Sequence, residues 1–287
     1  MPCLVKKLKL QTSYFKQAAS LSLQNKSIGL DKQTVTYKDL GKISYKEAWD
    51  YQEALLQVNV KAKSVLMNNK RMIAESAAGK LKDDHLSAGN LSSTAVADTN
   101  NHFLLCEHPP VYTLGKSGDT DNILISEEEM QKRQIEFYKT NRGGDITFHG
   151  PEQVVGYPIL DLEKFYTDIG RYLRELEEVI ILTIAEYGIK GDRSKGETGV
   201  WIDAGKPGKE RKICAMGVRC SRWITMHGFA LNVNTDLSYF DNIIPCGIFN
   251  KQVTSIEKEL NCKADIDEVK EKLCRNFEQV FNARLLR

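Results

Sequence analysis

Cysteine is the residue type through which this chain could carry out nucleophilic chemistry, and Cys246 has the neighbours best suited to it. It lies between Pro245, which makes the approach of the chain rigid, and Gly247, which leaves the thiol sterically open. Cys214 and Cys220 lie among apolar residues of an expected strand, which favours a buried or incidental role for their thiols. A nucleophilic Cys246 and a structural Cys246 both fit this pattern.

A nucleophilic thiol needs a basic partner elsewhere in the chain. Only the thiolate attacks, and the usual cysteine pKa of about 8.5 must be lowered by a nearby cation or by backbone dipoles. His149 and His227 are the ordinary choice of partner. Lys212 is the third candidate, because the strand that it begins continues into small residues at 215–217 that suit the wall of a pocket. Spacing alone leaves the choice among the three open.

A glycine-rich stretch at 142–161 has the composition of a ligand-binding edge. Its apolar runs at 145–148 and 153–160 predict two strands joined by a tight turn. Glycines at 143, 144 and 150 permit positive φ and let main-chain N–H groups approach a ligand, while Arg142 and His149 supply strong polar side chains. A plain β-hairpin with an incidental arginine and histidine is the alternative.

Two other patterns are weaker. On a strand, His102, Cys106 and His108 would face the same way, but an intervening leucine and a following proline pair give poor ligand geometry, so we expect no metal. The loop Gly115–Gly118 reads Gly-Lys-Ser-Gly but lacks the upstream glycine spacing of a nucleotide-triphosphate loop. A solvated turn is the interpretation that we adopt there.

Helices and strands alternate around these residues. Caps and apolar spacing predict helices from Ser44 to about Val60, from Ser126 to Glu136, from Thr167 or Asp168 to Gly188, and from Asp265 onward. Strands are expected at 102–108, 111–114, 200–203, 212–219 and 223–233, the two beginning at 200 and 212 forming a hairpin. We expect residues 1–43 to be an N-terminal extension of strand or loop, and 44–284 to be a single catalytic domain with an insertion or flexible loop at about 68–101.

Composition limits the class of protein. The chain has 287 residues, 41% of them hydrophobic, and a formal net charge of +2, which suits a globular protein and gives no field for nucleic acid. We expect no membrane partner, because no apolar run is long enough to cross a bilayer, and no secretory pattern is present. Seven scattered cysteines favour a reducing compartment, so we expect the cytoplasm, or the mitochondrial matrix or another organelle if the source is eukaryotic.

Several blocks together resemble the lipoyl(octanoyl) transferase family, in the same order along the chain. The resemblance covers about Ile43 to Cys274, interrupted by the insertion-like segment. Glu152 departs from it, because the family commonly has glycine there, and the first 40 residues have no evident counterpart. The matching blocks are Glu107-His-Pro-Pro-Val-Tyr-Thr-Leu-Gly115, Arg142-Gly-Gly-Asp-Ile-Thr-Phe-His-Gly-Pro-Glu-Gln, Lys212-Ile-Cys-Ala-Met-Gly217, His227-Gly-Phe-Ala-Leu-Asn-Val-Asn-Thr-Asp-Leu237 and Ile244-Pro-Cys-Gly247.

The resemblance implies an α/β fold like that of lipoate and biotin protein ligases, with a mixed sheet flanked by helices. It implies transfer of an octanoyl group from acyl carrier protein to a lysine of a lipoyl domain or glycine-cleavage H protein, without a cofactor. Cys246 would hold the acyl chain as a thioester and Lys212 would lower its pKa. The substrate-binding residues that it implies are Arg142, Gly143, Gly144, Asp145, Ile146, Thr147, Phe148, His149, Ala215, Met216, Gly217, Gly228, Phe229 and Ala230.

Some expectations extend beyond the motifs. The strand that bears Met216, together with Phe229, would line a tunnel for the acyl chain. An acidic carrier protein could meet a monomeric enzyme at the basic residues of the 206–222 hairpin. Two alternatives remain open: an ATP-dependent lipoate-protein or biotin-protein ligase, and a non-catalytic module that binds carriers or lipoyl domains.

Overall fold

The computed structural model describes residues 32–77, 98–244 and 252–287, which form a mixed β-sheet flanked by helices, as predicted. Nine described strands make the main sheet, in the order β12-β1-β2-β6-β10-β9-β8-β7 with β11 beside β9. β1 pairs in parallel with both neighbours and β11 with β9, and the other pairs are antiparallel. The strands are β1 (Gln33–Lys42), β2 (Asn101–Glu107), β6 (Gln153–Ile159), β7 (Gly191–Asp192), β8 (Val200–Ile202), β9 (Arg211–Ser221), β10 (Ile224–Asn232), β11 (Gln252–Val253) and β12 (Ala283–Leu286).

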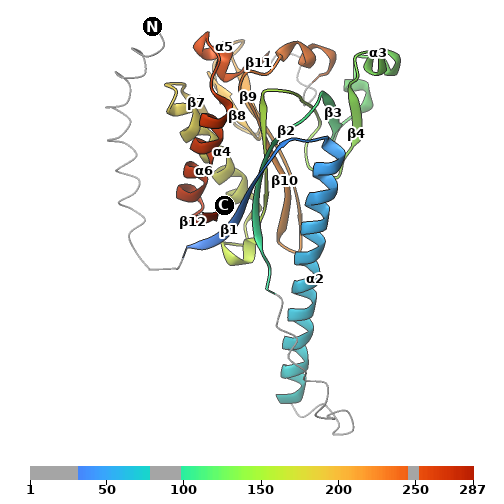
Figure 1. Cartoon of the computed structure of the whole chain (residues 1–287), viewed down its shortest axis with the longest axis vertical. Coiled ribbons are helices and arrows are strands. Elements are labelled where there is room, and N and C mark those ends of the chain that lie inside the picture. Colours follow the sequence, from blue (N-terminus) through green and yellow to red (C-terminus); the bar gives the residue numbers. More distant parts are fainter. Residues whose placement is uncertain (1–31, 78–97, 245–251) are drawn as a thin grey trace.

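Helices cover both faces of the main sheet. α4 (Ile169–Ala185) and α6 (Ile266–Val280) lie on one face, and the first half of α2 (Tyr45–Ala77) lies on the other (Figure 1). β6 and β10, in the middle of the sheet, are buried along their whole length. A strand covered on both faces is expected to be mainly apolar rather than alternating. These two sequences are mainly apolar, and their polar side chains, Gln153, Thr225, His227 and Asn232, are hydrogen-bonded.

A smaller sheet lies beside the main one. It contains β4 (Glu136–Lys139), β3 (Val111–Leu114) and β5 (Ile146–His149), with β3 between a parallel β4 and an antiparallel β5. Its apolar side chains form a cluster of their own with those of the short helix η4 (Leu237–Asn242) and of α3 (Glu127–Lys132). The turn from β5 to β6 therefore joins the two sheets at the glycine-rich stretch.

The predicted helix ends with strong caps are confirmed. Asp168 accepts a hydrogen bond from the Arg171 amide at the start of α4, and Asp265 accepts one from the Glu268 amide at the start of α6. Gly188, just beyond α4, has φ +77°, the left-handed conformation that suits glycine after a helix. The apolar faces of both helices are buried in the core on the same side of the sheet.

α2 is longer than its sequence pattern predicts. Its N-cap is Ser44 as expected, because the Glu47 amide donates to the Ser44 hydroxyl at 3.3 Å and that hydroxyl donates to the Glu47 carboxylate at 2.7 Å. The helix ends at Ala77, however, and not near Val60. The expected loop at 68–101 is therefore wrong for residues 68–77, while 78–97 lie outside the described residues. The second half of α2 projects beyond the sheet (Figure 1). Because no sheet covers it there, it has no apolar period by which the sequence could reveal it.

Several short elements were not predicted, among them β4, β11, β12 and α5 (Ile256–Leu260). β4 follows α3 after Gln134, whose φ of +54° ends the helix earlier than expected. β11 and β12 are short strands, and the five-residue helix α5 follows β11. Residues 33–42, inside the expected N-terminal extension, form β1 between β12 and β2. Such short or half-exposed elements depend on distant strand partners rather than on local periodicity.

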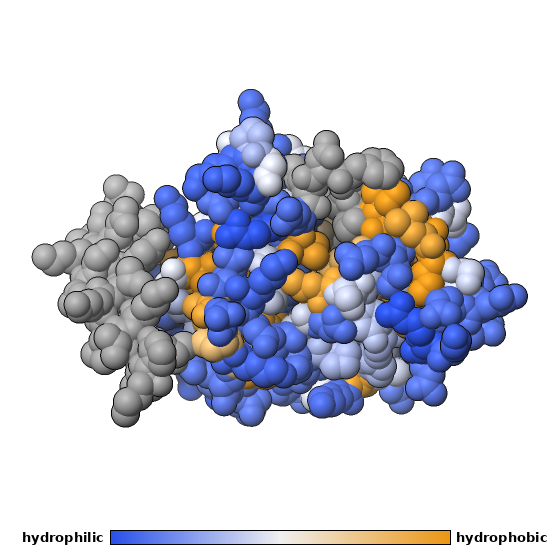
Figure 2. All heavy atoms as spheres, turned by 90° about the horizontal axis from the view of Figure 1, so that it is seen from above, coloured by the Kyte–Doolittle hydropathy of each residue, from blue (hydrophilic) through white to orange (hydrophobic). Residues whose placement is uncertain are grey.

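The surface is mainly hydrophilic with separate apolar patches, as seen from the side on which α5 and β11 lie (Figure 2). In the described ranges, no helix is both long enough and apolar enough to cross a membrane.

Candidate active site

Lys212 lies near the start of β9, between two neighbouring strands. On one side its register partner is Trp201 of β8, and the Lys212 ammonium nitrogen is 4.5 Å from the centre of the indole ring. On the other side it pairs with Val253 of β11, and the Thr254 amide donates to the Lys212 carbonyl at 2.9 Å. The ammonium is thus in cation–π contact with a buried aromatic ring, which restricts where the lysine side chain can lie.

A buried carboxylate shapes the approach to Lys212. Glu177 of α4 is fully buried and accepts the Gly199 amide hydrogen at 2.9 Å, while Arg174 and Arg193 bind its other oxygen. Gly199 has φ +119°, and a Cβ there would lie 2.6 Å from the Cys214 carbonyl oxygen and 3.6 Å from Cε of Lys212. Only glycine fits at this position, where the chain passes directly beside the lysine stem.

Cys246 lies in the segment 245–251, which is outside the described residues. The residues on either side of that segment are described. The Ile244 amide donates to the Asn122 carbonyl at 2.9 Å, and Ile243 bridges to Ile123. The chain resumes at Gln252, which pairs with Arg211 next to Lys212.

The segment 142–144 lies against β9. The Arg142 guanidinium is buried and donates to the Thr113 carbonyl at 2.6 Å and to its hydroxyl at 2.9 Å. The Gly143 amide donates to the Val218 carbonyl at 2.9 Å, and a Cβ on Gly217 would lie 2.6 Å from the Gly143 oxygen. The structure therefore brings together two of the predicted substrate-binding segments, and glycine at 217 is what allows the contact.

The two predicted triplets, 215–217 and 228–230, are partners in the sheet. Ala215 pairs with Ala230, Met216 with Phe229 and Gly217 with Gly228 across β9 and β10. Phe229 itself lies in the packed core, because it is 2% exposed and its ring lies on Gly156, where a Cβ would be 2.2 Å away. Two residues were expected to line the acyl tunnel. Met216 is half-buried, whereas the Phe229 side chain is packed among core residues.

The remaining predicted substrate-binding residues differ in the directions of their side chains. Asp145 accepts hydrogen bonds from the Asn122 side chain at 2.7 Å and from the Ile146 amide at 2.7 Å. Ile146 and Phe148 point into the apolar cluster of the smaller sheet, where Phe148 stacks on Tyr239. Thr147, between them, is half-buried.

Both candidate histidines are buried and already bonded. The His149 Nδ1 is 2.9 Å from the Gln153 side-chain oxygen, and the His227 Nε2 is 2.9 Å from that of Asn141. Burial lowers the pKa of each imidazole to about 3, so both are neutral near pH 7. Neither supplies a cation, in contrast to the half-buried ammonium of Lys212.

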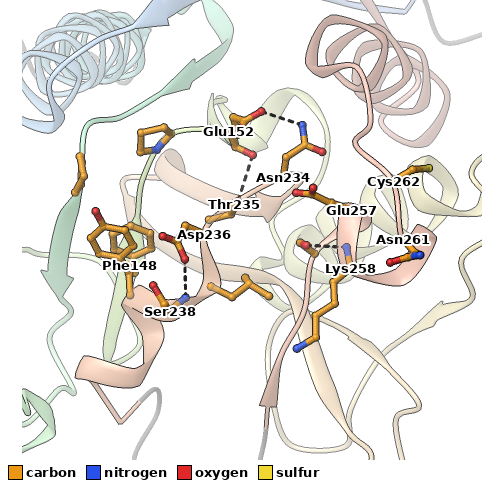
Figure 3. Close-up of a pocket in the computed structure, with 15 residues that line it drawn as sticks. Phe148, Glu152, Asn234, Thr235, Asp236, Ser238, Glu257, Lys258, Asn261 and Cys262 are labelled. Atoms are coloured by element: carbon orange, nitrogen blue, oxygen red, sulfur yellow. Dashed lines mark hydrogen bonds between the residues drawn. The ribbon is translucent and has the colours of Figure 1, made fainter.

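One surface hollow has a volume of about 870 Å³ and lies between the β5–β6 turn, η4 and α5 (Figure 3). Glu152, the residue that departs from the resemblance in sequence, lies on its wall with φ +58°. Its backbone keeps the glycine-like conformation, and its carboxylate is bound by Lys263 at 2.9 Å and by the Asn234 amide at 3.2 Å. The departure at Glu152 thus leaves the turn in place.

Sequence reasoning missed Trp201, Glu177 and Gly199, the three residues that shape the surroundings of Lys212. Val-Trp-Ile reads as an ordinary strand, and Glu177 lies within a long apolar helix. Glu177 alone could have been noticed in the sequence, because it is an acidic residue on an otherwise apolar helical face. Within the described part of the chain, no group of three or more His, Cys, Asp or Glu side chains is arranged to hold a metal ion.

The fold is that of the lipoate-protein ligases. A putative lipoate protein ligase from T. acidophilum superposes with a TM-score of 0.55 at 12% identity, over 90% of this chain and 88% of that one. Lipoate-protein ligase A bound with ATP gives a TM-score of 0.54 at 12% identity, over 90% of each chain. At such identities the likeness establishes the class of fold alone.

The sequence narrows that class. A model of the lipoyl protein ligase A/B catalytic domain matches residues 89–278. The octanoyltransferase of Christiangramia forsetii is 55% identical over 252 residues, covering 88% of this chain and 97% of that protein. The octanoyltransferase of Flavobacterium psychrophilum is 54% identical over 254 residues, covering 88% and 99%. The chain belongs to the lipoyl protein ligase A/B catalytic domain family, among its octanoyltransferases.

Proposed function

We propose that this chain moves an octanoyl group from octanoyl-acyl carrier protein, through a thioester on Cys246, to a lysine of a lipoyl domain or glycine-cleavage H protein. That reaction is the first step of endogenous lipoate cofactor synthesis. Octanoyl transfer itself follows from family membership. The observation that supports Cys246 and Lys212 as the reacting pair is the return of the chain at Gln252 and Val253 directly beside Lys212.

Covalent geometry restricts how far Cys246 can be from these anchors. Its Cα lies two peptide units from Ile244, hence within about 7.6 Å of that Cα in any conformation. Gln252, six units further on, pairs with the residue next to Lys212. The segment that carries Cys246 is therefore anchored at Ile244 on one side and, beside Arg211, at Gln252 on the other.

The first chemical step forms the enzyme thioester. The Cys246 thiolate attacks the carbonyl carbon of the carrier thioester, a C–S bond to the enzyme forms, and the carrier thiolate leaves and takes up a proton. An ammonium about 4 Å from the sulfur stabilises the thiolate by about 4 kcal/mol at an effective dielectric near 20, before desolvation. The indole of Trp201, with its ring centre 4.5 Å from the Lys212 ammonium nitrogen, restricts the position of that ammonium.

The second step reverses the roles. The acceptor amine attacks the enzyme thioester, an amide forms, and the Cys246 thiolate leaves. A neutral Lys212 then takes the proton that the attacking amine must lose. Backbone N–H groups along the glycine-rich segments are the available donors for the oxyanion in both steps. Because the acyl group is held by the enzyme between two substrates, ping-pong kinetics are expected.

The direct test is intact mass spectrometry after mixing with octanoyl-acyl carrier protein. The wild type should gain the mass of one octanoyl group, and both Cys246→Ser and Cys246→Ala should gain none. Lys212→Met should acylate slowly at neutral pH and recover at higher pH, where the thiol ionises without help. A wild type that never carries the acyl mass would refute the covalent mechanism.

The same experiment separates the alternatives. An ATP-dependent ligase would modify a lipoyl domain with free octanoate and ATP, even as Cys246→Ala. A binding module would retain the carrier without transferring its acyl group. The Cys246 thiol, which an adenylate mechanism does not need, is the feature that favours the transferase.

We further propose that the enzyme is monomeric and acts in the cytoplasm, or in an organelle matrix if the source is eukaryotic. Sedimentation at working concentration tests the first point, and the second is tested by fractionating cells that express the tagged protein.

The predicted basic surface at 206–222 is poorly suited to bind an acidic carrier, because most of its cations already form ion pairs within the protein. Lys206 pairs with Asp203, Arg211 with Glu259, and Arg219 with Glu53.

A further inference from the structure

A second hollow, of about 560 Å³, opens where β3 and β4 end side by side. These strands are parallel, with Leu114 in register with Lys139, so their carboxyl ends and the loops that follow meet at one edge. Ligands commonly bind at such an edge in α/β proteins. The hollow is lined by Leu114, Gly115, Lys116, Ser117, Gly118, Asp119, Thr120, Lys139 and Thr140.

The charges that line this hollow favour an anion. Lys116 and Lys139 are exposed, and neither forms an ion pair with any residue of the described ranges. The single carboxylate of the lining, Asp119, accepts the Asp121 amide hydrogen at 3.1 Å. The larger hollow has the opposite balance, because Glu152, Asp236 and Glu257 face it with one lysine, Lys258 (Figure 3).

One wall of this hollow supports the segment 142–144. The Lys116 amide donates to the Arg142 carbonyl at 2.9 Å. The Ser117 amide and hydroxyl both donate to the Gly144 carbonyl, at 3.3 Å and 3.1 Å. The loop expected to be a plain solvated turn is therefore bonded to the backbone of a predicted substrate-binding segment.

The other wall leads to Ile244. Thr120 begins the short helix η2 (Thr120–Asn122), and the carbonyl of Asn122 accepts the Ile244 amide hydrogen. The Asn122 side chain also donates to Asp145 at 2.7 Å, which joins this wall to the start of β5. The hollow thus lies between the predicted substrate-binding segment and the residue two positions before the proposed nucleophile.

We propose that this hollow binds the phosphodiester of the donor's phosphopantetheine arm, with Lys116 and Lys139 as its cationic contacts. The inference rests on the proposed function, since an acyl carrier presents its acyl group as a thioester at the end of such an arm. The anionic end of the arm remains at the protein rim while the thioester reaches inward past the segment 142–144. Lysine ammonium groups bind phosphate as point charges and tolerate an open site.

Small donors isolate the phosphate. Octanoyl-pantetheine and octanoyl-4′-phosphopantetheine differ only in that group, so the ratio of their kcat/KM values measures its contribution. For the wild type we expect the phosphorylated donor to be favoured by about fivefold to tenfold at low salt, the range for one or two exposed ion pairs. In Lys116→Met/Lys139→Met the ratio should approach one, and salt should have the same effect on the wild type. The matched control is Lys258→Met, an exposed lysine in the other hollow, which should keep the wild-type ratio.

Three outcomes would overturn the assignment. They are a wild-type ratio of one, a double variant that keeps the preference, and a loss of the preference in Lys258→Met. If only whole octanoyl-acyl carrier protein responds to the double substitution, the lysines contact acidic side chains of the carrier and not its arm. Failure of the proposed function is distinguishable, because then no small donor leaves an acyl mass on Cys246, whatever its phosphate.

Discussion

Trp201 and Lys212 face each other across the β8–β9 pair, with the lysine ammonium nitrogen 4.5 Å from the centre of the indole ring. The ring is 2% exposed, so its position is determined by the core and it in turn restricts the lysine. If Lys212 lowers the pKa of the catalytic thiol, the indole is a positioning residue for that function.

Replacing Trp201 should therefore change the pH profile of acylation. In Trp201→Leu the ammonium loses a contact of about 0.5–2 kcal/mol that restricts its position, so it stabilises the thiolate of Cys246 less well. The thiol should then titrate at higher pH, and acylation near pH 7 should slow by about threefold to tenfold. Trp201→Phe keeps an aromatic face and should lie between the leucine variant and the wild type. The measurement is the pH dependence of iodoacetamide alkylation of Cys246, with octanoyl transfer followed in parallel.

A purely structural role for Trp201 predicts a different result. Both variants would then lose stability while their alkylation profiles stayed with that of the wild type. Lys212→Met is the reference, because it should give the largest displacement of the profile.

Gly199 provides a test of close packing beside the lysine. Gly199→Ala should destabilise the protein by more than the roughly 1–2 kcal/mol that a left-handed residue costs, because its Cβ would lie 2.6 Å from the Cys214 carbonyl oxygen. Gly196→Ala is the control, since its φ of +82° is also left-handed but nothing lies within 4 Å of the added carbon. Urea unfolding of both variants measures the difference. Equal losses would mean that the backbone moves away at no cost.

The sequence predicted the features that repeat locally and missed those that depend on distant partners. Capped helices such as α4 and α6 carry their own signals in periodic apolar residues and in Asp168 and Asp265. The family blocks pointed to Lys212 and to the 142–149 segment, but no local pattern shows that Gly143 bonds to Val218, because that contact depends on how two sheets pack. The projecting half of α2 was missed because it packs against no sheet. A helix that is exposed on all sides has no apolar periodicity by which the sequence could predict it.

Glu152 should tolerate replacement by glycine. Its φ of +58° costs a residue with a Cβ about 1 kcal/mol relative to glycine, whereas its pair with Lys263 is between exposed side chains and contributes little. Glu152→Gly should therefore match or slightly exceed the wild type in unfolding free energy, while Lys263→Met should change it by less than about 0.5 kcal/mol. Chemical denaturation of both variants provides the measurement. A loss of more than about 2 kcal/mol in Glu152→Gly would mean that the Asn234 bond holds the turn.

Acid should destabilise the fold through three buried histidines near the start of α2. Desolvation lowers the pKa of His108 to about 4 and the pKa values of His149 and His227 to about 3, against an ordinary value of 6.5. As pH falls from 6.5 toward 4, the unfolded chain takes up protons that the folded protein does not, so the free energy of unfolding decreases. At pH 5.5 each histidine should account for about 1.4 kcal/mol of the decrease, giving about 4 kcal/mol for the three.

Urea unfolding at pH 7.5 and pH 5.5 measures this loss, and one substitution assigns it. In His149→Gln, which retains a polar group beside Gln153, the difference between the two pH values should shrink by about one histidine's share, whatever the variant does to stability at pH 7.5. His102→Gln is the comparison at a half-buried histidine of β2, where the reduction should be smaller. If His149→Gln loses as much stability on acidification as the wild type, then His149 is protonated inside the folded protein. The three histidines would then not form a cluster of neutral side chains in the folded protein.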